Sequence, residues 1–177
     1  MTQIQRKTWP YFAFGSNLWI PRLQARTPSA EFTGLGYITC HQLTFHKRGD
    51  DGSGKCDAFY TGNHSDRTYG ALYYLDPAEK PILDSIEGVG FGYELKHVEV
   101  QGFDSPIQAW LYSAQDGFRD PTMVPFDWYH RFVHAGAQAL GFPEPYLSAI
   151  AAQPIAEDPN PIRRAKNLAM LSNLALF

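Results

Sequence analysis

The sequence predicts a mixed α and β fold, in which a curved, barrel-like mixed β-sheet is flanked by helices and followed by a helical C-terminal tail. Many short aromatic-rich segments separated by turn residues indicate strands, and a few interspersed segments carry helical periodicity. The 177 residues suit one domain with a core of its own. A content of 44% hydrophobic and 19% charged residues is typical of an ordinary globular protein, and 15% aromatic residues favour strands and aromatic-lined pockets.

The first half of the chain is predicted to be mainly strand. Residues 8–14 are aromatic-rich and end at Gly15, and residues 19–24 suit a short helix because Pro21 falls in its first turn. Residues 41–46 alternate with the period of a half-buried strand, and the turn-rich residues 49–54 favour a hairpin after them. The other expected strands are residues 31–37, 56–61 and 69–75.

The second half alternates helices and strands. A helix is expected to begin at Asp76 as N-cap, with Pro77 at its first position and Glu79 in the capping-box place, and to stop at Gly88. Its apolar face consists of Ile82, Leu83 and Ile86. The pattern further predicts strands at 93–100 and 107–113 and helices at 125–140 and 144–152.

The last residues differ in character from the rest. Pro154, Pro159 and Pro161 interrupt the chain, and residues 162–176 resume as an amphipathic helix. We therefore expect a domain over residues 1–153 and a C-terminal extension over residues 154–177. The extension is expected to pack on its own domain or on a sister subunit, which leaves a homodimer open.

The composition argues against several kinds of partner. A net charge of −3 offers no basic surface, so we expect no nucleic-acid partner. We also expect no membrane partner, because no apolar run approaches the ~18 residues that cross a bilayer. The first residues lack the apolar core of a signal peptide, and Cys40 and Cys56 fit no metal-binding spacing. A cytoplasmic location with reduced thiols is the expectation.

The most informative segment is the apolar run at residues 11–14, which breaks abruptly into Gly15, Ser16, Asn17 and Leu18. A strand that ends in such small residues makes a turn whose backbone N–H groups can point outward together, as a seat for a carboxylate or phosphate. Alone, the same three letters Gly-Ser-Asn more often form a turn that caps the next helix.

Glu87 is the candidate catalytic carboxylate. It lies on the flank of its helix's apolar stripe, so it can be partly buried, and it sits at the helix C-terminus, where the macrodipole disfavours negative charge. Both effects disfavour the ionised form, as suits a general base working near neutral pH. From position alone, an exposed glutamate in a fraying last turn is the alternative.

These segments together resemble the γ-glutamylcyclotransferase family. Residues 11–18, Tyr-Phe-Ala-Phe-Gly-Ser-Asn-Leu, are similar to its signature loop, usually written Tyr-Gly-Ser-Asn-Leu. Residues 83–89, Leu-Asp-Ser-Ile-Glu-Gly-Val, followed by Gly92 and Tyr93, are similar to the motif that carries its catalytic glutamate. Residues 110–112 and Tyr129 fall where the family has its last strand and a pocket tyrosine. The likeness runs in one order from about Trp9 to about Tyr146 and leaves out the tail.

The resemblance implies a γ-glutamylcyclotransferase-like (AIG2-like) fold and an enzyme without a cofactor or metal. Members of the family release 5-oxoproline from a γ-glutamyl amino acid or amine, a lyase-like cyclisation of compounds met in glutathione metabolism. The α-amine of the substrate attacks its γ-carbonyl, so no enzyme nucleophile is needed. Glu87 takes the part of general base and acid. The substrate site is expected to comprise Phe14, Gly15, Ser16, Asn17, Leu18, Tyr93 and Tyr129.

One departure and several alternatives remain open. Phe14 stands where the motif usually has tyrosine, so a hydroxyl that orients substrate elsewhere is absent here. Tyr93 and Tyr129 are otherwise ordinary core aromatics. A specificity for a γ-glutamylamine or a biosynthetic intermediate, or a non-catalytic small-molecule binding module, is the alternative function. His130 and His134 have the spacing of a helical metal pair but lack a third ligand, and Ser16 lacks the elbow of a serine hydrolase.

Overall fold

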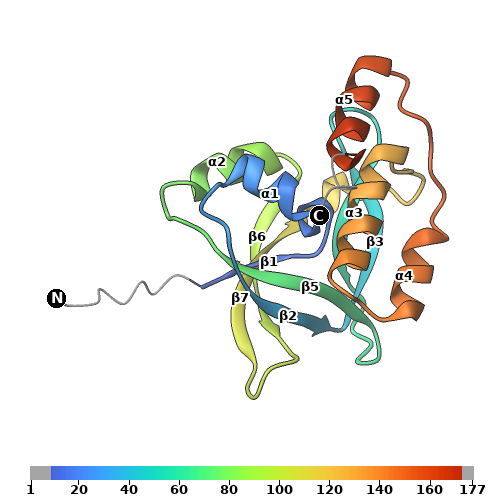
Figure 1. Cartoon of the computed structure of the whole chain (residues 1–177). Helices are drawn as coiled ribbons and strands as arrows, with labels where there is room; N and C mark the ends of the chain where they lie inside the picture. The colour runs from blue at the N-terminus through green and yellow to red at the C-terminus, as the bar shows by residue number, and fades with distance from the viewer. Residues whose placement is uncertain (1–8, 173–177) are drawn as a thin grey trace.

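The computed structural model describes residues 9–172, and a five-stranded mixed sheet lies at its centre (Figure 1). Its strand order is β2 (Glu31–Thr39), β5 (Arg67–Tyr74), β1 (Tyr11–Ala13), β7 (Ile107–Ala114) and β6 (Tyr93–Val100). The short β1 pairs antiparallel with β5 and parallel with β7. Two further strands, β3 (His41–Arg48) and β4 (Gly54–Tyr60), form a separate antiparallel hairpin. The hairpin predicted from the turn at residues 49–54 is confirmed.

The mixed α and β class is confirmed, but the five strands do not close into a barrel. The edge strands β2 and β6 are not paired with each other along their length. A single antiparallel bridge joins Tyr37 of β2 to Gln101, just after β6, through two backbone hydrogen bonds of 3.1 and 2.8 Å. The expected barrel-like shape is therefore only a loose description of an open, curved sheet.

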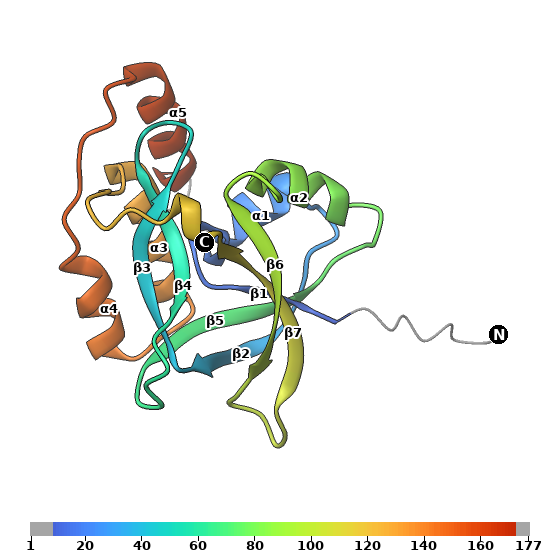
Figure 2. The same cartoon turned by 180° about the vertical axis from the view of Figure 1, so that it is seen from behind.

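The helices form two separate groups. α1 (Ile20–Arg26) and α2 (Lys80–Glu87) lie side by side, and α3 (Asp127–Ala139), α4 (Glu144–Ala151) and α5 (Pro161–Ser172) lie at the other end of the molecule (Figure 1). Seen from behind, the β3–β4 hairpin crosses in front of α3 (Figure 2). The ring of Phe45 on β3 contacts that of His130 on α3, with centroids 5.9 Å apart.

A close approach fixes α3 against the segment after β1. That segment is a 3₁₀ turn, η1 (Ser16–Leu18), and a second such turn is η2 (Asp116–Phe118). A Cβ atom on Gly136 of α3 would lie 2.7 Å from backbone atoms of Leu18 and Trp19, so only glycine permits this crossing. Phe12, Leu18 and Phe132 are at most 1% exposed and fill the core around it. The loop predicted to bind an anion is thus clamped between the sheet and α3.

Most predicted elements lie within a few residues of the observed ones, but the start of α2 is corrected. The helix begins at Lys80 instead of following Asp76 directly. Asp76 Oδ1 accepts the backbone N–H of Ala78, which makes a turn, and Glu79 Oε2 accepts the hydroxyl of Ser29 instead of closing a capping box. Pro81 occupies the first turn, where its missing N–H costs nothing. Residues 8 and 173–176 of the predicted elements lie outside the described residues.

Among residues 9–172, no helix combines the length and the apolar character that a bilayer span requires.

Candidate active site

The segment after β1 delivers a turn to the end of the sheet. The backbone N–H of Leu18 donates to the carbonyl oxygen of Gly15 at 3.0 Å, so it is already engaged. Among the hydrogen bonds between described residues, the N–H groups of Gly15, Ser16 and Asn17 find no acceptor. A Cβ on Gly15 would lie 2.9 Å from the Cβ of Cys56, which explains glycine at this position. The predicted cradle is therefore three N–H groups instead of four.

Glu87 ends α2 and points toward this turn. The helix stops at Gly88, whose left-handed φ of 71° is favourable for glycine. The Glu87 side chain is 18% exposed, and its Oε1 accepts hydrogen bonds from Asn17 Nδ2 at 3.0 Å and Arg26 Nη1 at 2.8 Å. Its Oε2 has no hydrogen-bond partner among the described residues. One oxygen is therefore held and the other is available.

Asn17 and Arg26 form a closed network around that held oxygen. Arg26 Nη1 also donates to Asn17 Oδ1 at 2.9 Å, and Asn17 Nδ2 donates to the hydroxyl oxygen of Tyr11 at 3.0 Å. The guanidinium of Arg26 therefore contacts the carboxylate of Glu87 and the amide of Asn17 through the same nitrogen. The side chain of Asn17 thus orients Glu87, while its backbone N–H belongs to the turn.

The two predicted tyrosines meet at Cys56 in the middle of β4. Tyr93 donates its hydroxyl to the carbonyl oxygen of Cys56 at 2.5 Å, and Tyr129 accepts the backbone N–H of Cys56 at 3.1 Å. Burial raises the pKa of both hydroxyls well above the usual value. Both therefore stay neutral, Tyr129 with a proton to donate and Tyr93 with lone pairs to accept.

Two connected cavities meet at Glu87. The inner hollow, of about 30 Å³, lies between the turn, Cys56 and Tyr112, and every predicted site residue except Leu18 lines it. The outer cavity, of about 240 Å³, extends from there past Lys47 and Lys55. Leu18 is 1% exposed and belongs to the core. Four residues line both cavities, and these mark the junction: Ser16, Glu87, Tyr93 and Tyr129.

Four cationic side chains that the sequence analysis missed line the outer cavity: Arg22, Arg26, Lys47 and Lys55. The two arginines are four residues apart on α1, so they share one face of the helix that follows the loop motif. That spacing was the signal available in the sequence. The two lysines flank the hairpin turn and carried no comparable signal, because their pairing depends on the register of β3 with β4.

Burial shifts the acid–base properties of these cations. Burial and, after it, the positive charge of Arg26 lower the pKa of Arg22 to about 10. Burial likewise lowers the pKa of Lys47 and of Lys55. For Lys55, an ion pair with Asp51 at 2.7 Å offsets part of this effect.

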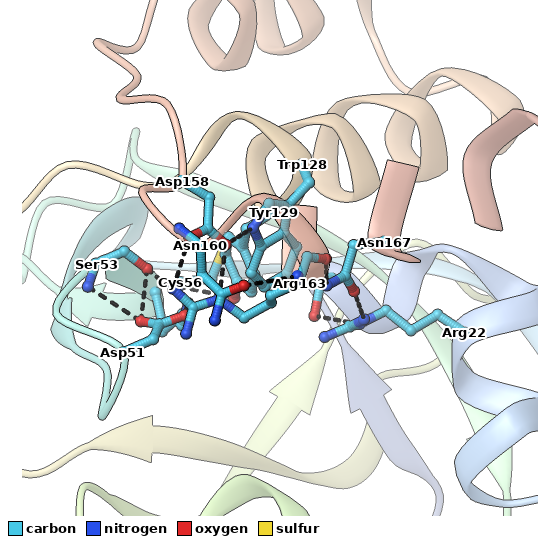
Figure 3. Close-up of polar contacts among 12 residues, drawn as sticks. Arg22, Asp51, Ser53, Cys56, Trp128, Tyr129, Asp158, Asn160, Arg163 and Asn167 are labelled. Atoms are coloured by element: carbon cyan, nitrogen blue, oxygen red, sulfur yellow. Dashed lines mark hydrogen bonds and ion pairs between the residues drawn. The ribbon is translucent and has the colours of Figure 1, made fainter. Parts of the chain in front are cut away.

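The C-terminal segment packs behind the outer cavity. Figure 3 shows Arg163 reaching Asp158, whose Oδ2 also accepts the indole N–H of Trp128 at 2.7 Å. In the same view Asn167 of α5 approaches Arg22, with Nη1 and Oδ1 3.4 Å apart. The guanidinium of Arg22 also lies 4.6 Å from the ring centre of Phe132. Arg22 is therefore held between α3 and α5.

The remaining residues considered in the sequence have structural contacts. Phe14 is 5% exposed, with its ring 6.5 Å from that of Phe12, centre to centre, and it lines the inner hollow. Burial raises the pKa of the Cys56 thiol, and Cys40 Sγ lies 3.3 Å from His64 Nδ1. His130 Nε2 lies 2.7 Å from the carbonyl oxygen of Ile150.

The chain is similar in sequence to known proteins. Residues 67–150 match the model of the AIG2-like family. The chain is 25% identical over 157 residues to the γ-glutamylcyclotransferase of Mus musculus, covering 82% of this chain and 79% of the relative. It is 24% identical over 163 residues to that of Homo sapiens, covering 86% and 82%.

A solved structure shares the fold over nearly the whole chain. It is described as a γ-glutamyl cyclotransferase, with a TM-score of 0.80 at 22% identity, over 93% of this chain and 98% of that one. The resemblance seen in the loop and the glutamate motif is thereby confirmed: the chain is similar in sequence to γ-glutamylcyclotransferases over most of its length and shares the fold of one.

Proposed function

We propose that this protein releases 5-oxoproline from a γ-glutamyl amino acid or amine, with Glu87 as general base and acid. The observation that carries the proposal is the asymmetric Glu87 carboxylate. Its Oε1 is fixed by Asn17 and Arg26, and its Oε2 is left available at the junction of the two cavities. A base held in one orientation beside an anion-binding turn suits an intramolecular cyclisation.

The reaction can be followed atom by atom. Glu87 takes a proton from the substrate α-ammonium, and the freed amine nitrogen attacks the γ-carbonyl carbon. A new C–N bond closes the five-membered lactam, the ring nitrogen gives up its second proton and the amide C–N bond breaks. The leaving nitrogen receives both protons by way of Glu87 and departs as an ammonium group. The products are 5-oxoproline and an amine or amino acid, so neither a cofactor nor an enzyme nucleophile takes part.

The cavity sizes suggest how substrate lies. The inner hollow admits little more than one or two waters, which suits a carboxylate or the developing oxyanion but not a whole γ-glutamyl group. The N–H groups of Gly15, Ser16 and Asn17 would bind that oxyanion or carboxylate. Tyr129 would donate a hydrogen bond from its hydroxyl to the substrate, and the hydroxyl oxygen of Tyr93 would accept one. The rest of the substrate occupies the outer cavity, which is somewhat smaller than the usual range of about 300–1,000 Å³ for ligand sites.

A turnover assay with a matched variant tests the proposal. The protein is incubated with a panel of γ-glutamyl amino acids and amines, and 5-oxoproline is quantified by mass spectrometry. Glu87→Gln keeps the shape of the side chain and removes the base, so we expect kcat to fall by roughly 10²–10⁴-fold. Glu94→Gln on β6 is the control and should retain wild-type turnover. Equal turnover by wild type and Glu87→Gln would show that Glu87 is not the base.

The alternatives give other outcomes in the same assay. Turnover restricted to γ-glutamylamines, or to one larger γ-glutamyl compound, would indicate the narrower enzyme. Binding of panel members without any 5-oxoproline would indicate a binding module, the alternative that Phe14 mildly favours. The small outer cavity favours a dipeptide-sized substrate over a large intermediate.

A further inference from the structure

We infer that the outer cavity contains an anion subsite, formed by Lys47 with Arg22, that recognises an oxyanion on the leaving part of the substrate. The inference rests on the proposed function and narrows its substrate class. The preferred substrates are γ-glutamyl compounds whose leaving group carries a carboxylate or a similar anion. γ-Glutamylamines that lack one are disfavoured.

Lys47 is the central observation. The residue is only 6% exposed, yet no carboxylate of the described residues lies within 4.0 Å of its ammonium. Its Nζ lies 4.6 Å from the ring centre of Tyr93 and faces the outer cavity. A buried charge without a counterion is costly, so its retention calls for a partner that comes from outside the protein.

The pairing of β3 with β4 adds a second cost. Lys47 stands directly opposite Lys55 in the ladder, and like charges in such cross-strand pairs repel. The neighbouring positive charges of Arg22 and Lys47 lower the pKa of Lys55, after the larger effect of its burial, so the three cations are close together. Lys55 is neutralised by Asp51, whereas Lys47 is not.

Arg22 is the second cation without a carboxylate. Among the described residues its guanidinium contacts only neutral oxygens, Ser16 Oγ at 3.3 Å and Asn167 Oδ1 at 3.4 Å. Arg26 is committed to Glu87. Asp50, which is exposed, also lines the outer cavity, but it forms no ion pair with Arg22 or Lys47 within 4.0 Å. Two spare positive charges remain for one small cavity.

The two cations of the subsite lie at different depths of the outer cavity. Arg22 contacts Ser16 at the junction, beside the turn, whereas Lys47 lies beyond Tyr93 and lines only the outer cavity. A substrate whose γ-carbonyl lies at the junction extends its leaving group toward Lys47. A leaving amino acid brings the missing carboxylate to that place, and a simple amine brings none.

A matched pair of substrates tests the inference. γ-Glutamylalanine and γ-glutamylalaninamide have the same size and differ only in a carboxylate against a carboxamide. We expect the wild-type kcat/KM to favour the acid by roughly 10- to 100-fold, as a charge-assisted hydrogen bond would give. Lys47→Met should bring the ratio close to one by slowing the acid alone, and Lys47→Arg should keep most of the preference.

Two further variants serve as a control and as a substitute for Lys47→Met. Lys96→Met removes a lysine of β6 that lies outside the cavity, against the ring of Tyr60, and should leave the ratio unchanged. If Lys47→Met fails to fold, as judged by circular dichroism, Arg22→Met takes its place and should also lower the ratio. A wild-type ratio near one, or a ratio unaffected by either variant, overturns the subsite.

Calorimetric titration separates this inference from the proposed function. If the wild type makes no 5-oxoproline from either compound, the proposed function fails. In that event, tighter binding of the acid than of the amide, lost in Lys47→Met, still supports the anion subsite. Equal binding of the two compounds, or no binding of either, overturns the subsite as well.

Discussion

The inner hollow and the outer cavity differ in how completely their polar groups are paired. Around the hollow, Asn17, Arg26 and Tyr11 form a closed network with one oxygen of Glu87. In the outer cavity, Arg22 and Lys47 lack a carboxylate among the described residues. A closed network holds a catalytic group in one geometry, whereas spare charges wait for a ligand. The difference separates a part built for chemistry from a part built for recognition.

The largest expected effect comes from opening the closed network. Arg26→Met removes the donor shared by Glu87 and Asn17, so both side chains lose their orientation. We expect kcat/KM to fall about 100-fold, since small misplacement of a catalytic group has effects of that order. The free energy of unfolding should fall by about 1–3 kcal/mol, because two acceptors lose a partner. Steady-state kinetics and urea unfolding measure both.

Arg131→Met provides the control for that change. Arg131 lies on the exposed side of α3, so its loss should leave both quantities nearly unchanged. An Arg26→Met enzyme with wild-type kcat/KM would mean that the network is structural and that Glu87 needs no such support.

A rise in pH is expected to have an intermediate effect on the substrate preference, through the charge of Lys47 in the outer cavity. Burial lowers the pKa of Lys47, and the nearby carboxylates Asp50, Glu87 and Asp51 only partly counter this. The lysine loses its charge as the pH rises through that lowered pKa, so the roughly tenfold or greater preference for γ-glutamylalanine over its amide should decline with rising pH. The ratio of the two kcat/KM values follows the charge of Lys47 in the free enzyme. Any titration that affects both substrates equally cancels in this ratio.

Lys47→Arg separates Lys47 from Arg22 in that profile. The new guanidinium stays charged, so the decline should disappear over the pH range in which Lys47 loses its charge. The same profile in wild type and Lys47→Arg would show that Lys47 does not hold the anion.

The smallest effect is expected at Phe14. The network around Glu87 is complete without a hydroxyl at this position, and the Phe14 ring is buried beside that of Phe12. We expect Phe14→Tyr to change kcat/KM by no more than about threefold, which corresponds to about 0.7 kcal/mol. An increase of tenfold or more would instead show that a hydroxyl at this position orients the substrate.

Local signals in the sequence predicted much of the fold. The strand at 93–100 was predicted with its observed bounds, because turn-forming residues lie close to both of its ends. The start of α2 was misplaced, because Asp76 and Pro77 are compatible with either a helix start or a turn, and the contact of Glu79 with Ser29 decides between them. That contact joins residues 50 positions apart, which a local pattern does not reveal.

The site residues likewise fall into two groups, those that a local motif predicts and those that only tertiary structure brings together. The turn and Glu87 carried motifs, so the sequence brought Ser16, Asn17 and Glu87 together correctly around the inner hollow. Leu18 was included because it belongs to the motif, although its side chain is in the core. Lys47 and Lys55 become neighbours only through the register of one hairpin, and Arg22 meets Asn167 only in the folded chain. Such pairings depend on tertiary structure.

The contact between Arg22 and Asn167 joins residues 145 positions apart. A ribosome completes α1 long before α5, so the nascent chain carries the loop motif, and then the glutamate, before it has the helix that supports this arginine. The contact that holds Arg22 beside the outer cavity therefore forms only after α5 has been made. A chain that ends before residue 161 would keep Glu87 and its network but would lack the contact of Asn167 with Arg22.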